Sequence, residues 1–488
     1  MQLAELVKDW PCKVRGSVRT TVQHITEHSE HVVEKSMFFA HKGRHVSGAK
    51  FIKKAIENGA VVIVTEDENV FDDWQYDEVI IWVPNSRLFC AYASHRFYGE
   101  PSHVLPIIAV TGTNGKTTVS HFIGQLAKSV DVKTLVIGTN GVFLDGELQQ
   151  DDEPLTTKSA VFLQRLLQRA VREHVQLVVL EASSMGLEQH RLDYCAIDVA
   201  VFLNISQEHI EDHQTFDNYK AAKRKLVPLS EQLVCNADDS FCHAVAVKCK
   251  QPVMLYSIIG QGDLSIQLLH EDVQHSLVNV TLGHYQDVCS LPFAGGYLQS
   301  NVAAALSALC MLGVDLAELL PAVSALSLPN GRMQCVELER GAQLYIDYAH
   351  TPAAFKHVLQ HLERHCKGKL IVVFSCGGER DKMKRQEMGR LASKYGDFII
   401  LTTDNCRTEK PEAINAQIRS GFFAMQQYEE ILDRKAAIER AMELAQEDDI
   451  VLIAGKGHEN VQIIGHTSEP FNDYETVLTL LTCLNDKK

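Results

Sequence analysis

The chain has 488 residues, of which 45% are hydrophobic and 22% are charged. This is an ordinary globular composition, and at ~150 residues per domain the length allows about three domains. The 47 basic and 62 acidic residues give a formal net charge of −15. A duplex nucleic-acid binder is therefore disfavoured, because such proteins neutralise phosphates with a basic face. The composition excludes a disordered chain and is compatible with a multidomain enzyme that has no nucleic-acid partner.

The first residues and the cysteines bear on the location of the protein. The segment MQLAELVKDWP contains Glu5, Lys8 and Asp9, so it lacks the apolar core of a secretory signal. No stretch reaches the ~18 apolar residues that cross a bilayer. The thirteen cysteines show no Cys-x-x-Cys pair or metal-type spacing, which favours reduced thiols. We expect a cytoplasmic protein, a monomer, with no membrane partner.

Residues 1–104 contain short strand-like runs at 60–65 and 78–83 and close in a polar stretch at 98–103. Such runs, bounded by turn-forming residues, predict a small N-terminal α/β domain.

Two longer segments alternate apolar runs with helical stretches, which is typical of parallel sheets with crossover helices. In residues 105–332 the runs lie at 105–110, 132–138, 177–180 and 199–203. In residues 333–488 they lie at 344–346, 369–374, 397–402 and 450–454. We therefore expect an α/β protein with a central nucleotide-binding domain and a C-terminal Rossmann-like, doubly wound domain.

Ligands of open α/β sheets bind outside the carboxyl ends of the strands. Polar, chemistry-bearing segments follow almost every predicted strand of the last two domains. They are TGTNGKTT at 111–118, Glu181, and the segments 204–209, 347–352, 376–381, 404–407 and 455–459. The predicted fold and the candidate site residues are therefore mutually consistent.

The segment TGTNGKTT between a predicted strand and a predicted helix is typical of a phosphate-binding loop. Its glycines let backbone N–H groups turn toward phosphate, its lysine supplies positive charge, and its second-last threonine offers a hydroxyl to Mg²⁺. The standard loop has a glycine where this chain has Val110, so the loop is a variant. The residues predicted to bind the phosphates of ATP or GTP here are Gly112, Thr113, Asn114, Gly115, Lys116, Thr117 and Thr118.

Three further residues have open roles when the sequence is taken alone. Glu181 and His209 are placed to complete a divalent-cation site, but each is equally compatible with a structural strand-end or capping position. Lys223, among Lys220, Arg224 and Lys225, is compatible with a solvated helix lysine.

Several motifs in order resemble the Mur ligases, and within them the MurE type. After TGTNGKTT come EASS with GLEQHR, NIS with AAK, NADD, GRM, DYAHTP, CGGERDKMKR and GKGHE, which together span residues 105–475. The resemblance implies an ATP-dependent ligase that joins UDP-N-acetylmuramoyl-L-alanyl-D-glutamate to meso-diaminopimelate through an acyl phosphate, in peptidoglycan precursor synthesis.

The resemblance also implies roles for the ATP site. Lys116, Glu181, His209 and Lys223 match the family's catalytic residues, and Lys223 matches a lysine carbamylated by CO₂. Two Mg²⁺ ions would then be held by Thr117, Glu181, His209 and the carbamate on Lys223. Further ATP contacts are implied for Asn301, Arg332, Asp347 and His350.

Two further residue sets are implied for the small-molecule substrates. The amino-acid acceptor would contact Arg380, Asp404, Asn405, Cys406, Arg407, Gly455 and Glu459. Arginines suit carboxylates and acidic groups suit ammonium groups. The UDP-muramoyl peptide would contact Ser29, Thr156, Thr157, Ser183, Gln189 and Arg191.

Some positions depart from the family pattern, mainly where the donor binds. His28-Ser29-Glu30 and the 43–48 turn replace an Asp-Ser-Arg segment and a Gly-x-x-x-Asp-Gly turn, and Cys406 replaces a proline. Other departures are Leu155, Met185 and Leu298. Two alternatives follow: a related ligase, similar to folylpolyglutamate synthetase, that uses another carboxylate donor or L-lysine as acceptor, and a non-catalytic nucleotide-binding regulator.

Overall fold

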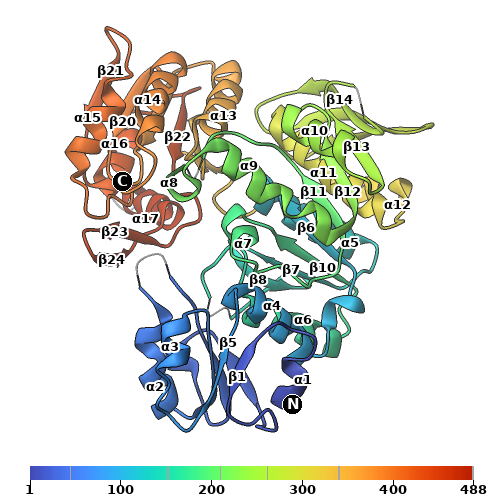
Figure 1. Ribbon diagram of the computed structural model, residues 1–488. Helices are drawn as coiled ribbons and strands as arrows, with labels where there is room; N and C mark the ends of the chain where they lie inside the picture. The colour runs from blue at the N-terminus through green and yellow to red at the C-terminus, as the bar shows by residue number, and fades with distance from the viewer. Residues whose placement is uncertain (44–45, 151–152, 209, 261, 339–340, 486–488) are drawn as a thin grey trace.

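The computed structural model describes residues 1–43, 46–150, 153–208, 210–260, 262–338 and 341–485. Within these residues the strands form three large sheets and one separate hairpin. Figure 1 shows the chain passing from an N-terminal domain (blue) through a central domain (cyan to yellow) to a C-terminal domain (orange to red). The predicted three-domain α/β architecture is confirmed.

The N-terminal domain is built on a five-stranded sheet in the order β1-β5-β4-β3-β2. The strands β2 to β5 are parallel neighbours and β1 pairs antiparallel with β5. Its strands are β1 (Lys13–Arg15), β2 (His24–Thr26), β3 (Ser36–Ala40), β4 (Ala60–Thr65) and β5 (Val79–Trp82). Its helices are α1 (Leu3–Leu6), η1 (Ser29–His31), η2 (Gly48–Phe51), α2 (Ile52–Glu57), α3 (Glu68–Asp72), α4 (Ser86–Phe97) and η3 (Pro101–His103).

The central domain contains an eleven-stranded sheet in the order β16-β15-β14-β13-β12-β11-β6-β10-β7-β8-β9. Its strands are β6 (Ile107–Thr111), β7 (Thr134–Gly138), β8 (Gly141–Leu144), β9 (Glu147–Gln149), β10 (Leu177–Glu181), β11 (Ile197–Phe202), β12 (Ser230–Asn236), β13 (Val253–Ser257), β14 (Leu264–Glu271), β15 (Ser276–Leu282) and β16 (Tyr285–Leu291). Its helices are α5 (Lys116–Ser129), α6 (Ala160–Arg172), α7 (Ser184–Glu188), α8 (Ile210–His213), α9 (Phe216–Arg224), η4 (Val227–Leu229), α10 (Ser240–Lys248), α11 (Gly296–Met311) and α12 (Leu316–Val323).

The strands from β14 to β7 pair in parallel, as the sequence predicts. Antiparallel strands extend the sheet at both edges: β15 and β16 on one side, β8 and β9 on the other. The sequence does not predict these edges, because exposed antiparallel strands lack the continuous apolar runs of buried parallel ones.

The C-terminal domain has a six-stranded sheet in the order β17-β18-β22-β19-β20-β21, with only β17 antiparallel to its neighbour among the described pairs. Its strands, with the hairpin β23-β24, are β17 (Gln334–Glu337), β18 (Gln343–Asp347), β19 (Leu370–Phe374), β20 (Phe398–Leu401), β21 (Gln427–Glu430), β22 (Ile450–Ala454), β23 (Val461–Ile464) and β24 (Thr467–Pro470). Its helices are α13 (Pro352–His365), α14 (Met383–Tyr395), α15 (Pro411–Arg419), α16 (Arg434–Leu444) and α17 (Asp473–Asn485).

Alternate residues of the buried strands enter two hydrophobic cores, one on each face of the sheet. In β6, Ile108 and Val110 pack into one core with α5 and α11, whereas Ile107 and Ala109 pack into the other with α6. The C-terminal sheet is divided in the same way between two cores. Because each strand side chain points to the opposite face from its neighbour, helices cover both faces and the strand ends are left for ligands.

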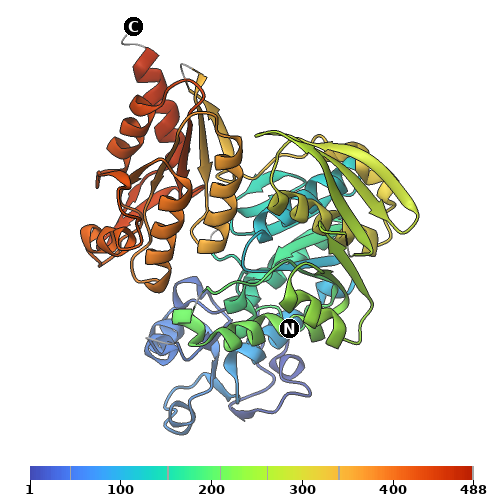
Figure 2. The ribbon, with the colours of Figure 1, turned by 90° about the horizontal axis from the view of Figure 1, so that it is seen from above.

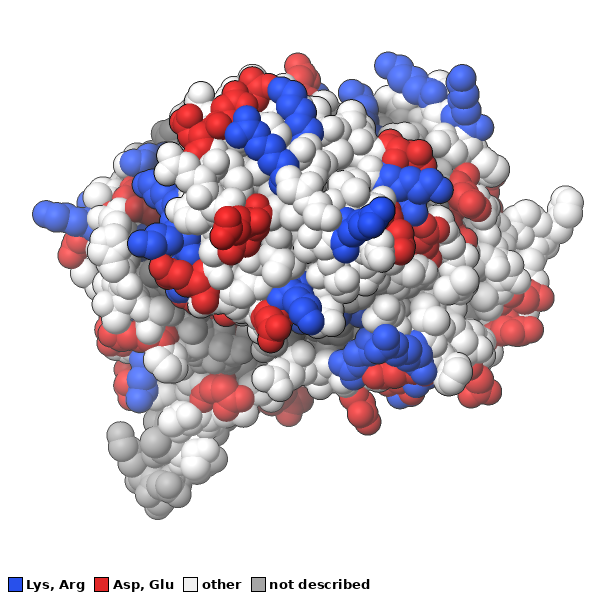
Figure 3. Space-filling view, turned by 60° about the horizontal axis from the view of Figure 1, so that its bottom comes forward, with Lys and Arg blue, Asp and Glu red and all other residues white. Residues whose placement is uncertain are grey.

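The central and C-terminal domains lie against each other, as Figure 2 shows. Val273 and Tyr297 of the central domain pack on the hydrophobic core of the C-terminal domain. On the face seen in Figure 3, basic and acidic side chains are interspersed, which is typical of a solvated surface. No helix in the described part of the chain combines the length and the apolar character needed to cross a membrane.

Candidate active site

The loop between β6 and α5 has the predicted phosphate-binding shape. Gly115 precedes α5 at φ +92°, and a Cβ there would lie 2.6 Å from Asn301 Oδ1. Both the left-handed backbone and the close contact require glycine. Thr113, Thr117 and Thr118 are buried. The loop therefore presents the start of a helix and buried hydroxyls at the carboxyl end of a central strand, the arrangement that binds phosphate groups.

Two buried lysines converge on this loop. Lys116 Nζ donates to the carbonyl oxygens of Gly112 and Thr113, both at 3.0 Å. Lys223 Nζ, from α9, donates to the same Gly112 oxygen at 2.8 Å, and Lys223 is only 1% exposed. Burial, with the nearby charge of Lys116, holds the pKa of Lys223 well below its usual value. The reading of Lys223 as a solvated helix lysine is therefore wrong, because its side chain is directed into the protein.

Glu181 ends β10 and is buried. Its Oε1 accepts from the Thr139 backbone N–H at 2.9 Å and its Oε2 accepts from Thr139 Oγ1 at 3.0 Å. Burial lowers the pKa of Lys116, whereas the carboxylates of Glu181 and Glu208 act in the opposite direction. Glu181 thus belongs to the electrostatic surroundings of the loop lysine. His209, the other predicted metal ligand, lies outside the described residues.

A cavity of about 510 Å³ opens beside the loop, between the central and C-terminal domains. Its lining includes Asn114, Gly115 and Thr118 of the loop and the predicted ATP contacts Asn301, Arg332 and Asp347. The Arg332 guanidinium lies over the Tyr348 ring at 4.6 Å, and its buried Nε has no hydrogen-bond partner in the structure. Burial raises the pKa of Asp347. An unpaired guanidinium donor suits an anionic ligand.

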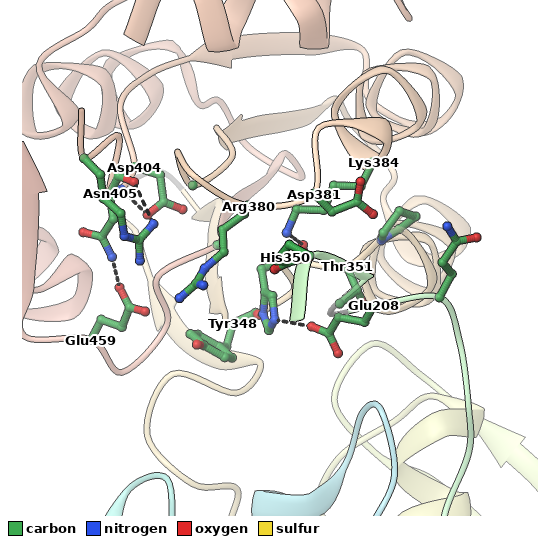
Figure 4. Close-up of a pocket in the computed structure, with 16 residues that line it drawn as sticks. Glu208, Tyr348, His350, Thr351, Arg380, Asp381, Lys384, Asp404, Asn405 and Glu459 are labelled. Carbon is green, nitrogen blue, oxygen red and sulfur yellow. Dashed lines mark hydrogen bonds and ion pairs between the residues drawn. The ribbon is translucent and has the colours of Figure 1, made fainter. Parts of the chain in front are cut away.

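A second cavity, of about 160 Å³, lies next to it and is shown in Figure 4. Six of the seven residues predicted for the acceptor line it: Arg380, Asp404, Asn405, Arg407, Gly455 and Glu459. The Arg380 side chain projects into the middle of the cavity (Figure 4). Cys406 does not line the cavity and is 1% exposed, packed in the hydrophobic core. The Cys406 side chain therefore contacts the hydrophobic core, although Asn405 and Arg407 on either side of it line the cavity.

A buried hydrogen-bond network holds the wall of this smaller cavity. Asn405 Nδ2 donates to Glu459 Oε2 at 2.7 Å. Lys456, which is 0% exposed, donates to Asn405 Oδ1 at 3.1 Å, to Glu459 Oε2 at 3.0 Å and to the Val461 carbonyl at 2.6 Å. Arg407 Nη1 donates to the backbone oxygen of Asn405 at 3.2 Å. Sequence reasoning missed Lys456, although it lies within the quoted GKGHE motif.

The segment after β18 lies between the two cavities. Asp347 lines the larger one, but His350, which the resemblance assigns to ATP, lines the smaller one. His350 Nε2 pairs with Glu208 Oε1 of the central domain at 3.0 Å, and Lys384 Nζ donates to the His350 carbonyl at 2.8 Å. Glu208 and Lys384 were also missed. Glu208 precedes His209 in the segment that follows β11. This position after a strand could have identified Glu208 as a candidate site residue.

The residues predicted for the muramoyl peptide form a cluster in the central domain, except for Ser29. Thr157 Oγ1 and Ser183 Oγ lie 2.9 Å apart, and Arg191 donates to the Thr157 carbonyl at 2.6 Å and to Gln189 Oε1 at 2.7 Å. Thr156 joins the cluster to the Glu181 region, because its Oγ1 lies 3.1 Å from Thr139 Oγ1.

Ser29 lies apart from this cluster, in η1 of the N-terminal domain, and is largely buried. Its carbonyl accepts from Asn58 Nδ2 at 3.0 Å. Residues 44 and 45 of the departing 43–48 turn lie outside the described residues. Nearby, Glu27 Oε1 lies 2.9 Å from His41 Nε2. Burial lowers the pKa of Arg191 of the central domain, and the negative charge of Glu27 acts to raise it.

Three family models match the chain in order. They are described as "Mur ligase family, catalytic domain" for residues 21–98, "Mur ligase middle domain" for residues 110–309 and "Mur ligase, glutamate ligase domain" for residues 331–457. Together they cover most of the chain.

Similar proteins match the chain over nearly its whole length. The UDP-N-acetylmuramoyl-L-alanyl-D-glutamate–2,6-diaminopimelate ligase of Chlamydia pneumoniae is 39% identical, with 99% of each chain covered. The ligase of this name numbered 2 in Clostridium acetobutylicum is 35% identical, with 96% of this chain and 97% of the relative covered. A solved structure of a ligase with the same name superposes with a TM-score of 0.69 at 32% identity, covering 99% of both chains. The chain therefore belongs to the Mur ligase family of ATP-dependent ligases.

Proposed function

We propose that the protein joins UDP-N-acetylmuramoyl-L-alanyl-D-glutamate to meso-diaminopimelate, with release of ADP and phosphate, in peptidoglycan precursor synthesis. The observation that carries the proposal is the pair of adjoining cavities. One is lined by residues of the phosphate loop and by Arg332, whose buried Nε has no hydrogen-bond partner among the described residues, and the other is lined by arginines together with acidic groups. The relatives that carry this name match the chain over nearly their whole length.

In the proposed reaction the γ-phosphate passes to the donor carboxylate, and the acceptor amine then displaces phosphate from the acyl phosphate. The loop residues 112–118, with Asn301, Arg332 and Asp347, hold ATP. Lys116 neutralises the phosphate charge as it moves from nucleotide to donor. His350, which pairs with Glu208 at 3.0 Å, lies on the acceptor side of this transfer.

The residues around the loop fit the Mg²⁺ ions and the carbamate that the family implies. Only a neutral amine adds to CO₂, and the depressed pKa of the buried Lys223 favours that form. Carbamylation would turn Lys223 into an oxygen ligand that, together with the oxygens of Thr117 and Glu181, suits Mg²⁺. The resemblance adds His209, which lies outside the described residues. Mg²⁺ bound there would neutralise charge on the phosphate and the donor carboxylate.

The acceptor cavity suits an amino acid that has carboxylates and ammonium groups at both ends. Arg380 and Arg407 would bind carboxylates, and Asp404 and Glu459 would bind ammonium groups. L-Lysine lacks the second carboxylate, so it would leave one of the two arginines without a carboxylate partner. The structure therefore favours diaminopimelate over lysine as the acceptor.

The domain boundaries proposed are 104/105 and 332/333. The N-terminal domain, through Ser29, would hold the uridine nucleotide, and the cluster of Thr156, Thr157, Ser183, Gln189 and Arg191 would hold the peptide part of the donor. A cytoplasmic location and a monomeric state stay predictions.

The test is a matrix of donors and acceptors assayed for phosphate release. Release should require ATP, Mg²⁺, the UDP donor and diaminopimelate together, and Arg380→Met should reduce it, whereas Arg390→Met on the exposed face of α14 should not. Equal turnover with L-lysine would refute the acceptor assignment. Product with another carboxylate but none with the UDP donor would favour the folylpolyglutamate-synthetase-like alternative, and nucleotide binding without any turnover would favour the regulator.

A further inference from the structure

A cluster of two histidines and a glutamate joins the central and C-terminal domains away from the phosphate loop. Glu271 ends β14 of the central sheet, and His361 and His365 lie one helical turn apart near the end of α13. We propose that Glu271, His361 and His365 form a Zn²⁺ site that bridges these two domains. The proposal does not depend on which donor or acceptor the enzyme uses.

The cluster has the spacing of a three-ligand metal site. Each residue offers one ligand atom, and these atoms all lie within 4.8 Å of one another. His365 Nε2 lies 3.6 Å from Glu271 Oε1, beyond hydrogen-bond distance. Two ligands bound tetrahedrally to Zn²⁺ at ~2.1 Å are about 3.4 Å apart. Histidines at positions i and i+4 of a helix, such as His361 and His365, project from the same face. A small adjustment of side chains is therefore enough to bind a metal.

The outer contacts of the cluster orient its ligands. Glu271 Oε2 accepts from the Gly295 backbone N–H at 3.2 Å and from Gln299 Nε2 at 3.4 Å, whereas Oε1 accepts from Arg364 Nη1 at 3.3 Å. The His361 ring lies 3.1 Å, through Nε2, from the Val273 carbonyl, so a neutral ring with hydrogen on Nε2 carries its lone pair on Nδ1. His365 Nε2 is buried without a hydrogen-bond partner. Such second-shell contacts are typical of metal sites.

The guanidinium of Arg364 competes with a metal ion for Glu271. Arg364 Nη1 lies 3.3 Å from Glu271 Oε1, but the Arg364 side chain is 68% exposed and can leave the carboxylate. Two imidazoles and one carboxylate suit Zn²⁺ better than Mg²⁺, which prefers oxygen ligands.

An ion bound at this site would fix the distance between the central and C-terminal domains, which enclose the larger cavity. Glu271 and His361 line the larger cavity from opposite domains. The hairpin tip that carries Val273 packs on the C-terminal core. A bound ion would fix α13 against β14, and so hold the cavity at the width seen in this structure.

The experiment measures Zn²⁺ affinity of the full-length protein by competition with a fluorescent chelator, in excess Mg²⁺. Wild type should bind one ion at this site, and His365→Ala and Glu271→Gln should each lower its affinity by at least ~10-fold, the effect that even outer-shell changes reach. Arg364→Gln, which removes the competing cation, should raise the affinity. His243→Gln, an exposed histidine on α10, is the matched control and should change nothing.

A second readout separates this site from the catalytic one. Zn²⁺ should raise the Tm of wild type and of Glu181→Gln, but not that of His365→Ala. The metal-free Tm of His365→Ala, compared with that of wild type, reports whether the variant folds. Equal Zn²⁺ affinity in wild type, His365→Ala and Glu271→Gln would overturn the proposal. Loss of all Zn²⁺ binding in Glu181→Gln would also overturn it, because the ion would then bind at the catalytic site.

Discussion

Replacing Lys456 by methionine should weaken binding of the amino-acid acceptor without touching the ATP site. Lys456 is fully buried, and it donates to two residues that line the acceptor cavity, Asn405 and Glu459, at 3.1 and 3.0 Å. Its third bond, to the Val461 carbonyl at 2.6 Å, holds the start of β23. Methionine fills a similar volume but removes all three donors.

The size of the effect follows from the bonds that are lost. A hydrogen bond to a charged group contributes about 1.5–3 kcal/mol. If one such bond holds Glu459 in its binding position, its loss changes the binding constant roughly 10- to 150-fold. The KM for diaminopimelate should rise by that factor, while the KM for ATP stays within about twofold, because the nucleotide cavity does not include Lys456.

The assay is phosphate release at saturating ATP and UDP donor, with diaminopimelate varied. Lys435→Met, at an exposed position on α16, is the matched control for loss of a lysine charge. Chemical denaturation of both variants shows whether Lys456→Met is folded. A folded Lys456→Met protein with an unchanged KM for diaminopimelate would refute the positioning role, and an equal rise in the KM for ATP would show a general loss of structure.

Three other predictions concern buried charged groups. Lys223→Ala should remove most activity, and a small carboxylic acid, but not chloride, should restore part of it; full activity without rescue would contradict the carbamate role. Burial acts to raise the pKa of Glu27, but the hydrogen bond and charge of His41, with Ser159 and Arg87, outweigh it and hold this pKa at about 2, below its ordinary 4.5. The charged form therefore stabilises the fold above pH 4.5, and this contribution disappears as the pH falls toward 2. Denaturant titrations at several pH values should show that the free energy of unfolding depends less on pH in Glu27→Gln than in wild type. The same pH dependence in both proteins would contradict this role of Glu27. Asp473→Asn should destabilise the fold by about 3–5 kcal/mol, because it leaves the buried guanidinium of Arg434 without its carboxylate; a loss under 1 kcal/mol in urea would contradict that reasoning.

The strands that position the site could be predicted because they are buried on both faces. The apolar runs at 105–110, 177–180 and 450–454 correspond to β6, β10 and β22, whose residues are all buried. The edge strands β15 and β16 could not be predicted in this way, because polar residues such as Asn279 and Asp287 interrupt their apolar runs. Their position also depends on the pairing of β15 with β14 and of β16 with β15.

The candidate site residues were predictable from their place after strands, but their partners were not. Nothing in the local sequence brings Lys223 to the Gly112 carbonyl, which is distant in the chain. The link between Glu208 and His350 likewise depends on how two domains meet. Cys406 shows the opposite case: its position in a motif predicted a substrate contact, yet the alternating direction of neighbouring side chains buries it in the core.

In the proposed reaction, the segment at the end of β18 would couple phosphate transfer to attack by the acceptor amine. Asp347 lines the nucleotide cavity, whereas Tyr348, His350 and Thr351 line the acceptor cavity. Thr351 Oγ1 also donates to Asn114 Oδ1 of the phosphate loop at 3.3 Å. These residues lie within five consecutive positions between a buried strand and α13, so they move as one unit with the C-terminal domain. A displacement of that domain that opens the nucleotide cavity must therefore also move the acceptor away from the loop. The acyl phosphate and the amine would then be brought together only when both cavities are closed, which keeps water from the reactive intermediate.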